Sequence, residues 1–206
     1  MVVPGGIEAR PRRVGHVALD LVIAGSAILI SCISLFIAIQ QSRTMQKQVA
    51  AASWPLLQFS SENTDEHDRP VINMSITNAG VGPALIKRFR IIYRGRTYDG
   101  YYPFLDACCG YSVAADDSTK VLRGTPQTSF IEGSVIKAGE NRPFLMMALT
   151  PENSSAWKKL DAARFELRFD ACYCSVLGDC WQSDLRVLDP KPVKACPPID
   201  PNKLGL

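Results

Sequence analysis

The sequence predicts a mainly β protein: an N-terminal transmembrane helix and a helical stalk, then an antiparallel β-sandwich of immunoglobulin-like type with one short helix. Three observations support this prediction. An uncharged apolar run lies near the N-terminus. Beyond residue 54, short segments alternate between apolar and polar residues, and turn signals separate them. Six of the seven cysteines lie outside the apolar run, an even number that favours disulfides in an oxidising compartment.

The apolar run is Leu21–Ile39, 19 residues without a charge. At ~1.5 Å per residue a helix of this length spans roughly 28 Å, close to the hydrocarbon core of a bilayer. We therefore expect this run to anchor the protein in a lipid bilayer. One alternative is a signal peptide cleaved after the A-x-A pattern at Ala50-Ala51-Ala52, and another is a lipoprotein acylated on Cys32. Both are less favoured, because the run is long for a signal peptide and stays apolar beyond Cys32.

The pattern divides the chain into five parts. We expect a cytoplasmic tail, the transmembrane helix, a stalk, an extracytoplasmic β-sandwich and a proline-rich extended tail, over residues 1–16, 17–40, 41–53, 54–188 and 189–206. Three arginines precede the apolar run and two basic residues follow it, Arg43 and Lys47. This bias favours a cytoplasmic N-terminus.

Alternation predicts the strands of the β-domain. The candidates are 56–60, 71–78, 84–93, 97–102, 130–137, 143–150, 164–174 and 180–188. In the second candidate the inward residues are Ile72, Met74 and Ile76. In the third they are Leu85, Phe89, Ile91 and Tyr93, with arginines on the opposite face. Residues 154–163 form the one expected helix, with Trp157 and Leu160 turned inward.

Six cysteines are candidates for disulfides: Cys108, Cys109, Cys172, Cys174, Cys180 and Cys196. Within 164–174, Phe165, Leu167 and Phe169 share the inward parity, so Cys172 and Cys174 point away from the core and need a cover. A turn near Leu177 would place Cys180 opposite Cys174. The first two cysteines lie in an expected loop that folds over the same face. The full connectivity stays open among 15 pairings.

A zinc, copper or redox site built from these cysteines is the alternative. Structural zinc sites favour C-x₂₋₄-C spacing, whereas this chain has C-C, C-x-C and C-x₅-C. The C-x-x-C pattern of thioredoxin-like centres does not occur in the sequence. We therefore expect disulfides, no metal and no cofactor.

The segment Asn78-Ala79-Gly80-Val81-Gly82-Pro83-Ala84 is the most distinctive local pattern. Asparagine and glycine adopt positive φ at little cost, and proline restricts φ before the next strand, so Asn78, Gly80, Gly82 and Pro83 predict a structural turn. Because Asn78 continues the inward face of its strand, its amide is expected to bond loop backbone. An anion-binding nest is the less favoured interpretation.

The order of parts resembles a loose group of uncharacterised bacterial single-pass membrane proteins. The matching features are one N-terminal span, a short stalk, Trp54-Pro55, then N-x-G-x-G-P-A within a β-domain, and the pieces Tyr173-Cys174-Ser175 and Cys180-Trp181. The resemblance implies an extracytoplasmic β-sandwich on a membrane anchor. Together with the charge bias, we expect the bacterial inner membrane as the location, with the domain in the periplasm. It implies no activity.

Charge and residue types exclude several functions. Residues 1–52 carry five basic and two acidic side chains, and the remainder carries 18 of each, so the β-domain has no electrostatic footprint for nucleic acid. The acidic cluster around Glu62–Asp68 lacks the order of a calcium loop and predicts a solvated turn. No serine lies in a G-x-S-x-G pattern, and we name no catalytic residue.

Tyr101, Tyr102 and Phe104 cluster before Cys108 in the expected loop. Grouped aromatic residues outside a core often mark a binding face, although these three would equally suit a lid on the domain edge. We therefore expect a non-enzymatic binding or scaffolding protein with a protein partner in the membrane or envelope. A thiol- or metal-dependent envelope protein is the second hypothesis, and a cytoplasmic domain with reduced cysteines is the third.

Overall fold

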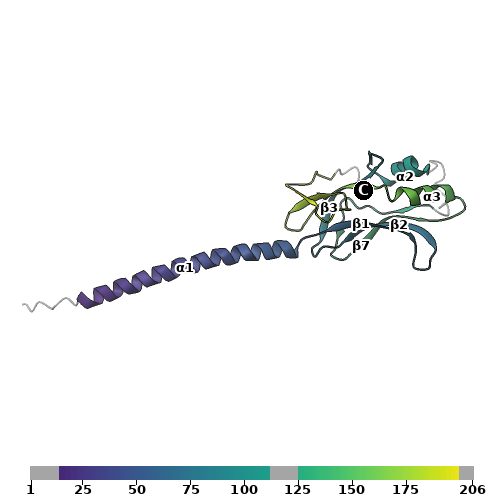
Figure 1. The fold of residues 1–206 in the computed structure, drawn as a ribbon. Helices are drawn as coiled ribbons and strands as arrows, with labels where there is room; N and C mark the ends of the chain where they lie inside the picture. Colours follow the sequence, from purple (N-terminus) through teal and green to yellow (C-terminus); the bar gives the residue numbers. More distant parts are fainter. Residues whose placement is uncertain (1–13, 112–124, 200–206) are drawn as a thin grey trace, which may run out of the picture. The chain divides into compact units, whose positions relative to one another are not determined.

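The computed structural model describes residues 14–111 and 125–199. Its first element is helix α1, Val14–Ala52, which contains the predicted apolar run and most of the predicted stalk (Figure 1). The stretch Leu19–Ala52 is long and apolar enough to cross a membrane, by length and composition. The Ser26 hydroxyl donates to the Ile23 carbonyl (2.8 Å) and the Ser31 hydroxyl to the Ala27 carbonyl (2.7 Å), so these polar groups are satisfied within the helix.

The chain forms two compact units, residues 1–49 and residues 50–206. The second unit is the β-domain, and the described residues form two antiparallel sheets in it. The first sheet has the order β1 (Leu57–Thr64), β2 (Pro70–Asn78), β7 (Asn141–Ala148), β5 (Gln127–Thr128). The second has the order β10 (Lys191–Val193), β9 (Cys180–Ser183), β8 (Arg168–Cys174), β3 (Ala84–Tyr93), β4 (Arg96–Tyr98), with β6 (Val135–Ile136) paired to β3. The mainly β class is therefore confirmed.

Aromatic side chains join the two sheets. Phe59 on β1 contacts Phe169 on β8, with ring centroids 4.6 Å apart. Phe144 on β7 contacts Phe89 on β3 at 5.2 Å. Each such pair adds about 0.5–1.5 kcal/mol beyond the area it buries. The core of the β-domain therefore lies between the sheets.

Alternation predicted the inward residues of β2 correctly. In β3 it was right for Phe89, Ile91 and Tyr93, which are buried, and wrong for Leu85. Ile72, Met74 and Ile76 are fully buried. In β3 the register against β8 shifts between Ile86 and Arg88. This irregularity reverses the side-chain parity, as a β-bulge does, so Ile86 points inward and Leu85, an expected core residue, is only half-buried.

The described residues of the β-domain contain two helices, where one was expected, and the two are neighbours (Figure 1). Helix α3, Ser154–Ala163, has the predicted bounds and buries Trp157 and Leu160. Helix α2, Tyr101–Cys109, was missed because residues 97–102 were assigned to a strand and the residues after them to a loop. Its first turn contains Pro103. Proline is tolerated in the first turn of a helix, where its missing N–H costs nothing.

Four expected strands are shorter in the structure. The expected strand 97–102 shortens to β4, and 180–188 shortens to β9. Only β6 forms within 130–137. The strand expected from residue 164 begins at Arg168, because the chain continues to turn after α3: the Glu166 N–H donates to the Ala163 carbonyl at 2.9 Å. Phe165, an expected core residue, is therefore 65% exposed.

Asn78 is completely buried, and its amide makes four hydrogen bonds. Its Oδ1 accepts from the backbone N–H groups of Leu56 (3.2 Å) and Gly80 (3.0 Å). Its Nδ2 donates to the carbonyls of Gly82 (2.8 Å) and Ile136 (3.0 Å). One side chain therefore joins the segment after α1, the glycine turn and β6.

The two glycines of this turn serve close packing. Neither Gly80 nor Gly82 is among the glycines with positive φ, so the predicted turn does not use the left-handed geometry that glycine permits. A Cβ on Gly80 would lie 2.4 Å from the Leu56 nitrogen, and one on Gly82 would lie 2.1 Å from the Ser53 oxygen. The turn backbone also donates from Val81 (3.0 Å) and Gly82 (3.2 Å) to the Trp54 carbonyl. Only residues without a side chain allow this approach.

Replacing Asn78 by alanine removes four hydrogen bonds from a buried site and leaves backbone groups unpaired. We expect Asn78→Ala to lower the free energy of unfolding by about 3 kcal/mol or more. Urea unfolding of the full chain in detergent micelles, followed by tryptophan fluorescence, measures this loss. Asn141→Ala, at an exposed position of β7, is the matched control and should change stability by less than about 0.5 kcal/mol. Equal effects of the two variants would contradict the role given to Asn78.

Candidate functional site: an aromatic groove beside a disulfide-linked sheet

Two disulfides cover the outward face of β8. Cys174 bonds to Cys180, which faces it across the β8–β9 pair, and Cys172 bonds to Cys196 in the C-terminal segment. Both β8 cysteines have the outward parity that the alternation indicated, yet Cys172 is only 2% exposed and Cys174 7%. Their partners supply the cover.

The sulfur atoms of Cys108 and Cys109 are bonded to each other at the end of α2. The expected loop at these residues is therefore wrong, and so is the expectation that they join the cysteines of β8. Cys109 instead packs into the core of the β-domain. The remaining cysteine, Cys32, is unpaired and exposed on α1.

The sulfurs of Cys174, Cys180 and Cys196 lie within 4.8 Å of one another, a spacing that would suit a metal ion. A metal needs thiolates, and all three sulfurs are engaged in disulfides. In this oxidised form the cluster acts as a covalent brace that ties residue 196 to the sheet.

An aromatic groove of about 220 Å³ opens where α2 begins. We call it the aromatic groove, and its lining comes from β3, from the end of β4, from the start of α2 and from the segment after β5. The lining residues are Phe89, Ile91, Tyr98, Asp99, Gly100, Tyr101, Tyr102, Pro103, Thr128, Phe130, Ile131 and Glu132. Phe89 and Ile91 also belong to the core, so the groove reaches the apolar interior from one edge of the domain.

Tyr101 and Tyr102, two of the three aromatics singled out in the sequence, line this groove. Tyr101 stacks on Phe144 at 5.8 Å, and its hydroxyl donates to the Ser129 carbonyl at 2.7 Å. Burial raises the pKa of Tyr101, so the phenol stays neutral. Tyr102 is 41% exposed.

Phe104, the third of these aromatics, does not belong to a binding face. It is fully buried between Tyr93 (5.8 Å) and Tyr98 (6.1 Å), because it lies on the inner side of α2. Sequence reasoning missed Phe130, which is 67% exposed at the groove, because alternation assigned it to a strand. Asp99 and Glu132 were also missed. The only local signal that could have marked them is the glycine that follows each, Gly100 and Gly133, because glycine is typical of turns.

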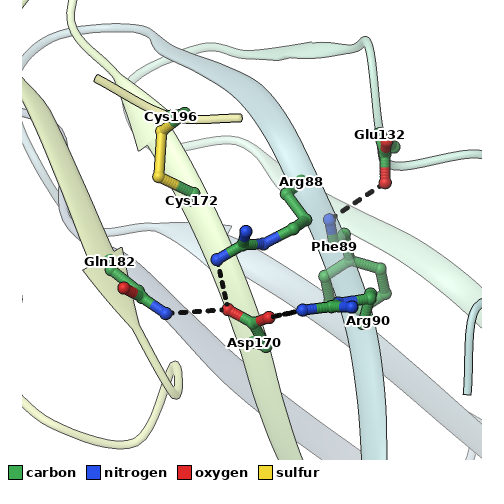
Figure 2. A network of polar contacts seen from close by, with 8 residues as sticks. All are labelled: Arg88, Phe89, Arg90, Glu132, Asp170, Cys172, Gln182 and Cys196. Carbon is green, nitrogen blue, oxygen red and sulfur yellow. Dashed lines mark hydrogen bonds and ion pairs between the residues drawn. A yellow bond between two sulfur atoms is a disulfide. The ribbon is translucent and has the colours of Figure 1, made fainter. Parts of the chain in front are cut away.

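A polar network lies on the outer face of the second sheet, opposite the parity of Phe89 (Figure 2). Asp170 Oδ1 accepts from Arg88 (2.9 Å) and from the Gln182 amide (3.0 Å). Asp170 Oδ2 accepts two bonds from the Arg90 guanidinium. Burial acts to raise the pKa of Asp170, but Arg90 and Arg88 together hold it below its usual range.

The network also binds an arginine that lies within electrostatic range of the acidic residues of the groove. Hydrogen bonding to Asp170 raises the pKa of Arg90, and the more distant charges of Asp99 and Glu132 add to this effect. Glu132 accepts a hydrogen bond from the Phe89 N–H at 3.2 Å, as Figure 2 shows. Among the described residues that line the groove, Asp99 and Glu132 are acidic and none is basic. The groove therefore combines aromatic walls with two carboxylates.

The acidic cluster of the β1–β2 turn has a structural role. Asp65 Oδ1 accepts from the N–H groups of His67 (2.9 Å) and Arg69 (3.0 Å), and its Oδ2 pairs with the Arg69 guanidinium at 2.6 Å. These bonds lower the pKa of Asp65 to about 2. The carboxylate organises its own turn, as expected for Asp at such positions.

No protein-family profile, curated protein or solved structure matches this chain. The evidence for the function of this chain is therefore the aromatic groove and the residues that line it.

Asp170→Asn removes the negative charge between Arg88 and Arg90. Because the folded state lowers the pKa of Asp170, its stabilisation is present above the ordinary value of 3.8 and is lost as the pH falls through the folded pKa. We expect the variant to lose about 2 kcal/mol at pH 7, discounted for the partly exposed arginines, and the difference to shrink below about pH 3.8. Urea unfolding of the full chain between pH 2.5 and 7 measures this. The exposed Asp106→Asn is the control, and a pH-independent difference would contradict the assignment.

Proposed function

We propose that this chain is a single-pass bacterial inner-membrane protein whose periplasmic domain binds a protein partner in the cell envelope. In this proposal the N-terminus is cytoplasmic and the β-domain is an immunoglobulin-like β-sandwich. The protein acts without catalysis, as a binding or scaffolding component. The apolar run of α1 supports the anchor, and the three disulfide pairs support an oxidising compartment.

The observation that carries the binding role is the aromatic groove. Exposed Phe130 and Tyr102 flank a depression that reaches core residues. Solvent-exposed aromatic side chains around a concave apolar site are typical of surfaces that bury a partner's side chain. A residue inserted there would exclude water from these rings, and the hydrophobic gain would hold the partner.

Reporter fusions and thiol accessibility test the compartment. Alkaline phosphatase fused after Leu206 should be active, and a green fluorescent protein fused there should be dark, because the proposal places the β-domain in the periplasm. Alkylation of denatured, unreduced full chain should modify Cys32 alone. Fluorescence together with seven reactive thiols would contradict the proposal and would favour a cytoplasmic domain with reduced cysteines.

A photo-crosslinking amino acid at position 130 tests the groove in the host cells. We expect a discrete crosslinked product with the full chain, and we expect Tyr102→Ala to abolish it by removing one wall of the groove. The same amino acid at position 165 is the control, since Phe165 and Phe130 are 65% and 67% exposed. Equal products from both positions, or a product at 130 that ignores Tyr102→Ala, would contradict a role of the groove in partner binding.

A further inference from the structure

We infer that the aromatic groove binds one cationic side chain, an arginine or a lysine, presented by an exposed segment of the partner protein. The inference rests on the proposed function, which requires only that the groove binds a partner. It adds the chemical class of the group that enters. Three properties of the groove support it: its size, its aromatic walls and the sign of its charges.

The size of the groove suits one long side chain. Its volume of about 220 Å³ is smaller than the roughly 300–1,000 Å³ of sites that enclose a drug-sized ligand. Arginine and lysine carry a slender apolar stem that packs along apolar surface and a polar head that stays near the opening. The floor at Phe89 and Ile91 is apolar, and the carboxylates belong to half-buried Glu132 and exposed Asp99. The apolar floor therefore suits the stem of such a side chain, and the carboxylates suit its charged head.

The walls of the groove favour a cation. Tyr101, Tyr102 and Phe130 present aromatic rings, whose faces attract ammonium and guanidinium groups. The Tyr101 phenol is neutral, since burial raises the pKa of this group. The chain already uses this contact elsewhere: the Arg164 guanidinium lies 4.3 Å from the ring centroid of Phe165.

The charges of the groove favour a cation as well. Asp99 and Glu132 line it, and within residues 14–111 and 125–199 no basic side chain does. Arg90 lies within electrostatic range of both acids, but Asp170 engages its guanidinium from the outer face of the sheet. The backbone N–H of Phe89 fixes the Glu132 carboxylate at the groove. An anionic group, such as a phosphate or a carboxylate, would meet like charge here.

The test uses the full chain in nanodiscs, with 4-fluorophenylalanine at position 130 observed by ¹⁹F NMR. The probes are three capped tripeptides, glycine–X–glycine, in which X is arginine, norleucine or glutamate. We expect the arginine peptide to shift the ¹⁹F signal at about tenfold lower concentration than the norleucine peptide, and the glutamate peptide to bind more weakly than both. A label at position 165 should not respond.

Charge-removing variants complete the test. Glu132→Gln keeps an acceptor for the Phe89 N–H and should weaken the arginine peptide about tenfold, without changing the norleucine peptide. Asp99→Asn is a second variant, which removes the other carboxylate of the groove and should also weaken the arginine peptide. It leaves the hydrogen bond between the Phe89 N–H and Glu132 unchanged. Glu166→Gln, which removes a carboxylate paired with Arg94 outside the groove, is the control. Far-UV circular dichroism confirms that each variant is folded.

Two results would overturn the inference. Equal binding of the arginine and norleucine peptides, unaffected by Glu132→Gln, would show that the groove takes a neutral side chain, and the proposed binding function would stand. Absence of a response at position 130 to every peptide would also overturn it, and the crosslink at position 130 would then decide separately whether the groove contacts a partner.

Discussion

The buried amide of Asn78 determines how the chain enters the β-domain. Its four hydrogen bonds reach Leu56 after α1, the glycine turn and the carbonyl of Ile136 in β6. Each of these backbone groups would otherwise need a partner away from water, and their geometry admits no side chain at Gly80 or Gly82. The junction, the turn and a strand 58 residues downstream are therefore positioned by one residue.

The periodicity of apolar residues correctly predicted the elements that are regular along their whole length. Helix α3 and the inward face of β2 follow directly from periodicity, since Trp157, Leu160, Ile72, Met74 and Ile76 all point inward. The failures are places where geometry changes within a segment. The irregularity after Ile86 reverses the parity of β3, and the turn after α3 delays β8 until Arg168. The alternation of apolar and polar residues does not reveal where a strand has an inserted residue. It also does not reveal where a turn ends and a strand begins.

The candidate site was predictable only in part, because it is assembled from separate parts of the chain. Tyr101 and Tyr102 are adjacent, so their aromatic character was visible in the sequence. Phe130 and Glu132 reach the same groove through the pairing of β5 with β7 and of β6 with β3. Phe104 shows the opposite error: it is close in sequence to the two tyrosines, but the turn of α2 directs it into the core. Sequence distance is a poor guide to which of several aromatics share a surface.

The Cys172–Cys196 bond closes a ring of chain that contains β9 and β10. A single peptide-bond cleavage between these two cysteines would leave both fragments covalently attached, because the disulfide bridges the break. The C-terminal piece would separate only after reduction. A molecule cut there by a protease would therefore keep the outer strands of the second sheet attached, and the cut would be invisible on a gel run without reductant.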